Sequence, residues 1–445
     1  AGGGSGGAGA TGGGGSGSAA STTNGGLDGQ GVTSTTVRVG FFYTTNSQAA
    51  NQAFGVHTAD QGNQLAEEQA LVAWTNQHGG IAGRQIQAVY VGEDTSQAET
   101  NPNTNLDGCR TMVEDYHVFA VMGGGGPPDD TEADQCYASA GTLNFDVLQA
   151  SPDTSTLRSW SPYIWLTDDA AVDRTMRWEV AGLASRGFFT TSPTYKLGVI
   201  VAQDNVNDNV YNSVTLPALE SAGLSSSQID RYDVPHDTID DIANTMKQAV
   251  IRFQADGVTN VIFQGGGNYG AGSYALLFML SAESQHYTPR YGLSSDDAPS
   301  ALVGNVPQDQ FNNALAIGTL PGADTDDAHY APYPYTPGEK QCAAIMAAAG
   351  ISFTSRQGSL TAGAFCDAMF EFQAGAASLV NRPLNPQLWA NSAMQLGGLT
   401  AVDMYARTIG PGHFDAAGGY RLLHAVQNCE GSNACFVYDN NNLYS

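Results

Sequence analysis

Residues 62–93 read GNQLAEEQALVAWTNQHGGIAGRQIQAVYVGE, and this stretch decides the fold that we expect for the chain. Its first half carries apolar residues at helical spacing and runs into the glycine pair 79–80. A glycine just past the last turn is the usual end of a helix, because glycine tolerates a left-handed backbone. Residues 81–84 predict a second tight turn, and residues 85–91 alternate in polarity as a strand does. The stretch therefore predicts a helix, two tight turns and a strand in succession.

The charge balance of the chain limits its partners. The 445 residues carry 43 Asp and Glu against 17 Lys and Arg, a formal net charge of −26. Such a surface repels nucleic acid and anionic lipid, and no basic stripe offsets it. No run approaches the roughly 18 apolar residues that a membrane span needs. The length predicts two lobes of about 150–200 residues each, and the composition indicates a secreted protein with a solvated acidic surface.

The six cysteines form neither a Cys-x-x-Cys pair nor a His-Cys cluster with zinc-ligand spacing. An even count in a chain of extracellular character favours three disulfides, although the count alone leaves the connectivity open. We expect sequential pairing, because the first two pairs fall on successive helices and the third closes a short hairpin. The predicted disulfides are Cys109–Cys136, Cys342–Cys366 and Cys429–Cys435. The alternative is a set of buried free thiols in a cytosolic protein.

The composition changes sharply along the chain. Residues 1–35 consist almost entirely of Gly, Ser, Ala and Thr and predict a disordered tether, because they bury too little apolar surface to fold. From residue 37 onward, short apolar runs alternate with longer helical stretches, which is typical of parallel α/β sheets. The expected strands lie at 37–42, 85–91, 118–122, 143–146, 196–201, 229–233, 260–263, 290–293, 314–317, 420–427 and 434–438.

The helix, Gly-Gly-Ile-x-Gly-Arg turn and strand of residues 62–93 resemble a passage of the type I periplasmic binding proteins. That family contains the branched-chain amino-acid receptors of ABC importers. The resemblance continues in order along the chain, from the first strand at 39–42 through the helix and strand at 109–122. It extends to the opening unit of the second lobe at 197–204 and to the late helix at 365–369. The ordered series, and no single motif, carries the resemblance.

The resemblance implies an α/β fold of two doubly wound lobes joined by three crossovers, with a ligand cleft between the lobes. Lobe 1 would comprise residues 36–166 plus 294–415, and lobe 2 residues 167–293 plus 416–445. In open parallel sheets, ligands bind outside the carboxyl ends of the strands, where helix N-termini offer unpaired N–H groups. We therefore look for the site in the loops that follow strands.

In the first lobe, the resemblance implies ligand contacts from three such loops. Phe54 would lie over the ligand, although a core phenylalanine at a helix start is an equal alternative. The backbone of Gly124 and Gly125 would hold a carboxylate, but glycines at 123–126 replace the family's serine-rich loop, so only N–H donors remain. The third loop contributes Gln149, Ala150 and Ser151, with the Ser151 hydroxyl at the head group of an amino acid or simply as a loop serine.

In the second lobe, the resemblance implies contacts from Asn207 and Tyr269, and an acidic residue just after the strand at 290–293 adds a further contact. Asn207 stands where the family often has a tyrosine, which leaves the amino-acid specificity open. Asp296 aligns with the acid that commonly pairs with an α-ammonium group, and Asp297 is an equal candidate on sequence. A buried carboxylate there needs a cationic partner. The alternative is a solvated turn carboxylate in an acidic chain.

Other functional motifs are weak. The glycines of 265–270 match Gly-x-Gly-x-x-Gly, but dinucleotide binding favours the first βα unit and an acid about 20 residues later. The acidic, Asn-rich stretch 204–209 lacks the glycine and terminal glutamate of an EF-hand. The eight histidines show no metal-binding spacing, and paired carboxylates are too frequent to single out. We predict no catalytic residue, no metal and no cofactor.

The sequence thus predicts an extracytoplasmic receptor that captures a small polar ligand, an amino acid or a related amide or acid, by hinge closure. It would deliver the ligand to an ABC permease, work as a monomer, bind no nucleic acid and touch the membrane only through an N-terminal lipid anchor. A sensory or surface-interaction protein on the same fold is the alternative from another class. An enzyme on an α/β scaffold is the third interpretation.

Overall fold

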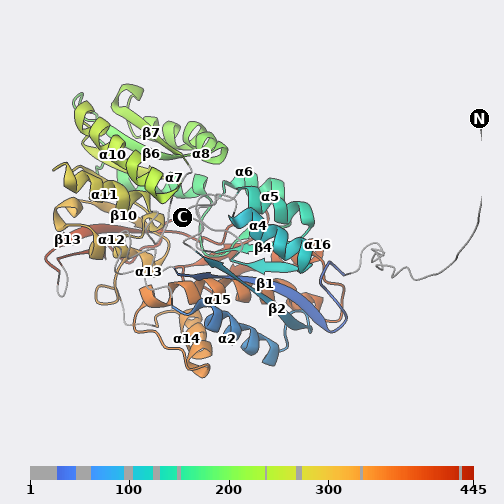
Figure 1. Ribbon diagram of the computed structural model, residues 1–445. Coiled ribbons are helices and arrows are strands. Elements are labelled where there is room, and N and C mark those ends of the chain that lie inside the picture. The colour runs from blue at the N-terminus through green and yellow to red at the C-terminus, as the bar shows by residue number, and fades with distance from the viewer. Residues whose placement is uncertain are drawn as a thin grey trace, which may run out of the picture.

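The computed structural model describes residues 28–46, 62–94, 104–123, 131–147, 152–235, 238–266, 273–330, 334–429 and 433–445. These residues form two α/β lobes, each around its own sheet (Figure 1). A small antiparallel pair, β11 (Gly397–Leu399) and β12 (Arg407–Ile409), accompanies them. The predicted fold class, two doubly wound α/β units, is confirmed.

The first lobe contains a five-stranded sheet in the order β2-β1-β3-β4-β5, parallel throughout. Its strands are β1 (Thr36–Thr45), β2 (Gln85–Asp94), β3 (Ala120–Met122), β4 (Leu143–Asp146) and β5 (Ile164–Leu166). The order reverses between β2 and β3, so the connecting helices cover opposite faces of the sheet. On one side lie α2 (Gln64–Gln77), α14 (Pro337–Ala348) and α15 (Arg356–Ala376), and on the other α4 (Thr104–Arg110) and α5 (Thr131–Ala140) (Figure 1).

An aromatic cluster fixes the late helices of this lobe on the sheet. The Trp389 ring of α16 (Pro386–Ala393) lies 4.9 Å from that of Trp165 and 5.0 Å from that of Phe145, both centroid to centroid. The Phe372 ring of α15 lies 5.1 Å from Phe145. Edge-to-face contacts of this kind add to the area that the rings bury. Residues more than 200 positions apart therefore share one core.

The second lobe contains a seven-stranded sheet in the order β14-β13-β10-β9-β8-β6-β7. Its strands are β6 (Leu197–Gln203), β7 (Ile229–Pro235), β8 (Asn260–Gln264), β9 (Arg290–Leu293), β10 (Leu315–Gly318), β13 (Arg421–Gln427) and β14 (Ala434–Tyr438). Only β13 and β14 run antiparallel to their neighbours. Two separate apolar clusters cover its faces. One includes α10 (Ile239–Asp256), α11 (Tyr274–Ser284) and α12 (Pro299–Asn305), and the other α7 (Val172–Ala184), α8 (Asn205–Val210) and α9 (Leu216–Ser221).

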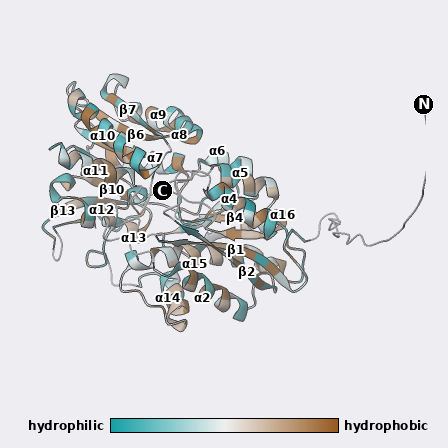
Figure 2. Cartoon of the chain, in the orientation of Figure 1, coloured by the Kyte–Doolittle hydropathy of each residue, from teal (hydrophilic) through white to brown (hydrophobic). Residues whose placement is uncertain are grey.

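The hydropathy of the helices fits this layered arrangement. In Figure 2, α10 carries both hydrophobic and hydrophilic residues, and its buried residues Ile242, Met246, Ala249, Val250 and Phe253 recur at helical spacing. Thr238 caps its N-terminus, and Gly257, at φ 74°, ends it. Within the described chain, no helix combines the length and apolar character that crossing a bilayer requires.

The stretch 62–93 folds as the sequence predicts. Asn63 caps α2 by accepting a hydrogen bond from the N–H of Ala66, and the glycines at 79, 80 and 83 all adopt positive φ. Ile81 and Arg84 exchange backbone hydrogen bonds of 2.8 and 2.9 Å, which closes the turn. Strand β2 then pairs with β1 along its whole length. The turn therefore sets the register between the helix and the first sheet.

Two boundaries differ from those expected. Strand β10 pairs with β9, so the chain leaves the second sheet after Gly318 and not at residue 293. Sequence pattern alone does not show which sheet a short strand joins. At the N-terminal end, the described residues 28–35 pack on the first lobe: the Asp28 carboxylate accepts hydrogen bonds from Arg84 and from the N–H of Leu384.

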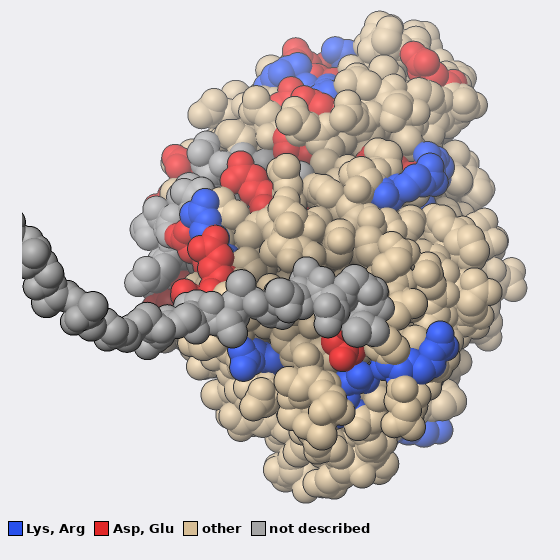
Figure 3. All heavy atoms as spheres, turned by 90° about the vertical axis from the view of Figure 1, so that its right-hand side faces the viewer, with Lys and Arg blue, Asp and Glu red and all other residues tan. Residues whose placement is uncertain are grey.

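The disulfides follow the predicted sequential pairing. Cys109–Cys136 joins α4 to α5, Cys342–Cys366 joins α14 to α15, and Cys429–Cys435 closes the β13–β14 hairpin. The surface is less uniformly charged than the net charge suggests. On the face in Figure 3, charged side chains are sparse and stand in small groups. Part of the acidic excess is instead buried, with fourteen Asp and Glu residues among the buried polar set of the described chain.

The turn at 79–84 yields the first prediction. In Gly80→Ala the new Cβ would lie 1.9 Å from the backbone oxygen of Arg84, whereas at Gly79 nothing lies within 4 Å. Both positions have positive φ, so both variants carry backbone strain. We expect Gly80→Ala to lower the free energy of unfolding by about 2 kcal/mol more than Gly79→Ala. Urea denaturation of the two variants measures the difference, and equal losses would contradict the role of the close approach.

Candidate functional site

The segments that connect the lobes meet at the end of β5. Residues 414–417 run beside this strand, where Leu166 donates a backbone hydrogen bond to Phe414 at 3.0 Å. The Asp415 carboxylate accepts a hydrogen bond of 2.7 Å from the N–H of Ala171, just before α7, and forms an ion pair with Arg174 on that helix. A crossover segment is thus tied to the first helix of the second lobe.

Four carboxyl groups gather beside this junction. Glu179 comes from α7, Asp296 and Asp297 from the 3₁₀ turn Ser295–Asp297 after β9, and Asp324 from α13 (Pro321–Asp324) after β10. We call this set the acidic cluster. Glu179 and Asp324 are 0 % exposed and Asp297 is 4 % exposed. Asp296 is half-buried, with its Oδ1 atom inaccessible.

The members of the acidic cluster differ in their hydrogen bonds. Asp297 accepts from the N–H of Ser294 at 2.8 Å, which closes the 3₁₀ turn. Asp324 accepts from the hydroxyls of Ser295 (2.7 Å) and Tyr405 (2.6 Å). Both oxygens of Glu179 and the Oδ1 of Asp296 have no hydrogen-bond partner among the described residues. The cluster is therefore only partly satisfied by its surroundings.

Burial raises the pKa of every member of the acidic cluster. It raises the pKa of Asp297 to about 8, of Asp324 to about 7 and of Asp296 to about 6. The pKa of Glu179 lies well above its ordinary value, through burial and then through the nearby charges of Asp297 and Asp296. Within the described chain, none of the four carboxyl groups forms an ion pair.

The first lobe shows what a neutralised carboxyl group looks like in this protein. Arg407 forms ion pairs with Asp367 (3.1 Å) and Glu371 (2.6 Å), and all three side chains are buried. Asp367 also accepts hydrogen bonds from the N–H groups of Val402 and Asp403, which positions the segment before β12. These acids hold the structure together. Their ion pairs with Arg407 separate them from the acidic cluster.

Most of the predicted ligand contacts of the first lobe lie outside the described residues. This applies to Phe54, Gly124, Gly125, Gln149, Ala150 and Ser151, and in the second lobe to Tyr269. In sequence they follow β1, β3, β4 and β8. Their contacts with a ligand stay predictions.

Three predicted residues are described. Asp296 and Asp297 belong to the acidic cluster and lie side by side in the turn after β9. Asn207 is buried in α8, where its N–H and Nδ2 donate to Asp204 and its oxygens accept from Gln264. The polar atoms of Asn207 are therefore engaged by Asp204 and Gln264. Residues 204–209 form the capped start of a helix, so the structure gives no support to a calcium-binding loop there.

Sequence reasoning missed two members of the acidic cluster. Glu179 lies four residues from both Thr175 and Leu183, which are buried on the same face of α7. A glutamate at a core-facing helical position is a signal that could have been found. Asp324 offered no such signal, because its burial depends on α13 packing against β10. The described residues contain one group of metal-ligand type, His329 with Cys429 and Cys435, and its two thiols form a disulfide.

Comparison with known proteins identifies relatives in structure only. No family model matches the chain, and no curated protein matches it in sequence. A solute-binding protein of an ABC transporter from Rhodopseudomonas palustris BisB5, in complex with 3,4-dihydroxy benzoic acid, superposes with a TM-score of 0.62 at 13% identity over 91% of this chain and 96% of that one. A fatty acid ABC transporter substrate-binding protein from Thermomonospora curvata superposes with a TM-score of 0.60 at 16% identity, over 92% of this chain and 93% of that one.

A branched chain amino acid ABC transporter protein from Thermus thermophilus with bound valine gives a TM-score of 0.60 at 13% identity, over 94% of this chain and 98% of that one. Each comparison covers nearly the full length of both chains, including both lobes. The chain therefore has the fold of the type I periplasmic binding proteins, as the turn at 79–84 and its ordered companions predict. At these identities the likeness concerns the fold.

The acidic cluster yields the second prediction, on pH. The folded pKa of Asp297, about 8, lies above its ordinary value of 3.8, so the folded state binds a proton that the unfolded state has released. Stability from this group is complete below about pH 3.8 and is lost as the pH rises toward about 8. We compare the melting temperature of Asp297→Asn with that of the native protein at each pH. We expect the difference, variant minus native, to be more positive at pH 8 than at pH 5.5. An identical difference at both pH values would contradict a neutral Asp297.

Proposed function

We propose that this protein is a solute-binding receptor that captures a small polar ligand with a cationic head group, such as the ammonium of an amino acid or a related amide. The carrying observation is the acidic cluster, which combines deep burial, incomplete hydrogen bonding and the absence of any ion pair within the described chain. Unpaired buried carboxylates are costly, and an entering ammonium group removes that cost. Asp296 is the best-placed partner, because its Oδ1 has no hydrogen bond.

Lobe closure is the mechanism that this fold supports. The ligand would bind at the carboxyl ends of β9 and β10, beside the crossover segments, and closure about those segments would exclude water from it. Water exclusion strengthens the attraction between an ammonium group and Asp296, because the local dielectric constant falls. No covalent step is involved. The solute-binding proteins of similar fold, including the one with bound valine, support this proposal.

We further propose that the receptor works outside the cytoplasm, as a monomer, and delivers its ligand to an ABC permease, with an N-terminal lipid anchor as its only membrane attachment. Three disulfides fit an oxidising compartment. The second candidate is a sensory receptor on the same fold, which would bind the same ligand but no permease. Thermal-shift screening against amino acids, amides, short-chain acids and sugars, followed by solution scattering, tests both. A hit that stabilises and compacts the protein supports capture, and turnover of that hit would favour an enzyme instead.

The third prediction concerns Asp296. Asp296→Asn keeps the shape of the side chain but removes its charge, so a cationic ligand from the screen should lose at least ~30-fold in affinity, or about 2 kcal/mol. The matched control is Asp309→Asn, which removes the same charge from an exposed position. Isothermal titration calorimetry measures both. Unchanged affinity in Asp296→Asn, or a preferred ligand that carries no positive charge, would refute the proposed head-group contact.

A further inference from the structure

A second group of side chains lies where β13 begins, next to the end of β10. Arg421, the first residue of β13, is paired in register with Gly318, the last residue of β10. Its guanidinium carbon lies 4.6 Å from the ring centre of Tyr405, 5.2 Å from that of Tyr438 and 5.8 Å from that of Tyr330. We call these three residues the tyrosine cage. Rings at these distances attract a guanidinium group through their negative faces.

Arg421 lacks a polar partner. It forms no hydrogen bond and no ion pair with any described residue, and its Nε atom is inaccessible and unpaired. Every other arginine that the structure describes as buried or half-buried donates at least one hydrogen bond. These residues are Arg38, Arg84, Arg174, Arg186, Arg231, Arg290, Arg356 and Arg407. Arg38 and Arg290 also lack an ion pair among the described residues, but both donate to backbone carbonyls, so Arg421 is set apart by having no side-chain hydrogen bond at all.

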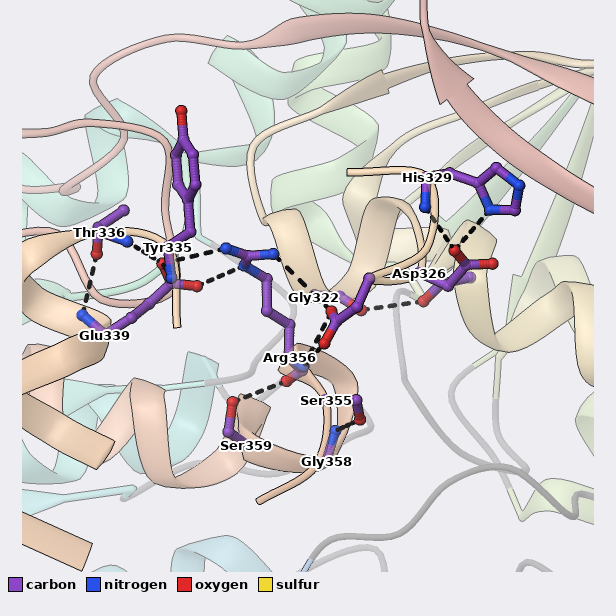
Figure 4. A network of polar contacts seen from close by, with 12 residues as sticks. Gly322, Asp326, His329, Tyr335, Thr336, Glu339, Ser355, Arg356, Gly358 and Ser359 are labelled. Atoms are coloured by element: carbon purple, nitrogen blue, oxygen red, sulfur yellow. Dashed lines mark hydrogen bonds and ion pairs between the residues drawn. The ribbon is translucent and has the colours of Figure 1, made fainter. Parts of the chain in front are cut away.

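The neighbouring arginine shows the contrast. Arg356 also lies over Tyr330, at 4.3 Å, but its guanidinium is bonded to Glu339 at 2.5 Å and lies 3.8 Å from Asp327. Figure 4 shows Arg356 held between partners on both sides. Its charge is therefore neutralised within the protein. No described residue forms an ion pair with Arg421.

The acid that touches the tyrosine cage does not neutralise Arg421 either. Asp324 accepts hydrogen bonds from Tyr405 and Ser295 and forms no ion pair within the described chain. Tyr405 and Tyr438 share a hydrogen bond between their hydroxyls, so both of these phenols are occupied. The hydroxyl of Tyr330, by contrast, is inaccessible and has no partner among the described residues. The cage thus holds one unneutralised guanidinium and one free phenol donor.

We propose that Arg421 and the hydroxyl of Tyr330 form a binding site for a small oxyanion, of which a carboxylate is the best match. A guanidinium group presents parallel N–H donors that suit a planar carboxylate, and a charged hydrogen bond is stronger than a neutral one. The hydroxyl of Tyr330, whose ring centre lies 5.8 Å from the guanidinium carbon, supplies a further donor to the same anion. Buried donors without acceptors in a native structure indicate a missing partner, and the positive charge requires that partner to be an anion.

The position of this site connects it to the acidic cluster. Ser295 and Asp324 link the turn after β9 to Tyr405 through hydrogen bonds of 2.7 and 2.6 Å. Strand β10 separates β9 from β13, so the end of β9 and the start of β13 lie about 10 Å apart across the sheet. One source of the carboxylate is thus the captured solute, with its ammonium at Asp296 and its carboxylate at Arg421; this source rests on the proposed function. The other source is a free anion.

The test uses the full chain and the probes acetate, benzoate and phosphate, with chloride at equal ionic strength as the reference. We expect at least one carboxylate to stabilise the protein saturably in thermal-shift titrations. In Arg421→Met the apparent affinity should fall at least 10-fold, and in Tyr330→Phe a few-fold. The matched control is Arg252→Met, because Arg252 also lies over a tyrosine ring, at 5.5 Å from Tyr232, but pairs with Asp230 and Asp256.

If Arg421→Met does not fold, Arg421→Lys replaces it in the test, since lysine keeps the charge but lacks the planar pair of donors. The Arg421→Lys variant should bind carboxylates more weakly than the native protein. No saturable stabilisation by any of the three anions, or an equal response in the native protein and the Arg421 variants, overturns the site.

Titration with the cationic ligand separates the two sources. If the solute supplies the carboxylate, acetate competes with it and Arg421→Met weakens its binding. If a free anion occupies the site, solute affinity is unchanged in Arg421→Met while the response to acetate is lost. If Asp296→Asn binds the cationic ligand as tightly as the native protein while acetate still stabilises the protein, the proposed function is refuted and the anion site is supported.

Discussion

Parallel strand pairing is the constraint on which the rest of this structure depends. Because β9 and β10 run parallel, their carboxyl ends lie at the same edge of the second sheet, and the turn after β9 lies beside α13. Strand β13 runs antiparallel to β10, so its first residue, Arg421, starts at that edge. Three segments that are distant in sequence, the turn after β9, α13 and the start of β13, therefore form one polar region. The same topology brings Asp415 of a crossover segment against α7.

The protein handles buried charge in two ways. In the first lobe, Arg407 neutralises Asp367 and Glu371, and these ion pairs fix one arrangement of α15 and β12. Beside the crossover segments, the Glu179 carboxyl group and the Arg421 guanidinium form no ion pair with any described residue, and burial keeps Glu179 protonated by raising its pKa well above the ordinary value. A fold selected for stability alone would replace or pair such groups, because each one costs free energy when it is desolvated. Their presence in the crossover region is the physical reason for assigning a ligand to this region.

Sequence patterns predicted the parts of the fold that local rules control. The positive φ of the glycines at 79, 80 and 83, most strand positions and the sequential disulfides depend on short stretches of chain, whereas the three-residue strands β5, β11 and β12 were not predicted. The sequence placed β10 in the first lobe, whereas the structure pairs it with β9 in the second sheet. Which sheet a strand joins depends on its partner strand and not on its own sequence. The site divides in the same way. Asp296 and Asp297 follow a strand directly and were predicted, whereas Asp324 and Arg421 enter the region only through the packing of α13 and β13.

Protons and a cationic ligand compete for the acidic cluster. This competition determines how the affinity for the ligand changes with pH. A cation beside Asp296 and Asp297 lowers the pKa of both carboxyl groups, so its binding releases protons wherever the empty site holds them. Burial raises the pKa of Asp297 to about 8, so near neutral pH this group is largely protonated before a cation arrives. The affinity for a cation therefore rises with pH up to that value. An anion at Arg421 acts in the opposite direction, because its negative charge favours protonation of Asp324, whose pKa is about 7. A solute that carries both charges releases protons at one end and favours proton uptake at the other. These two effects oppose each other, so its binding depends less on pH than the binding of a cation or an anion alone.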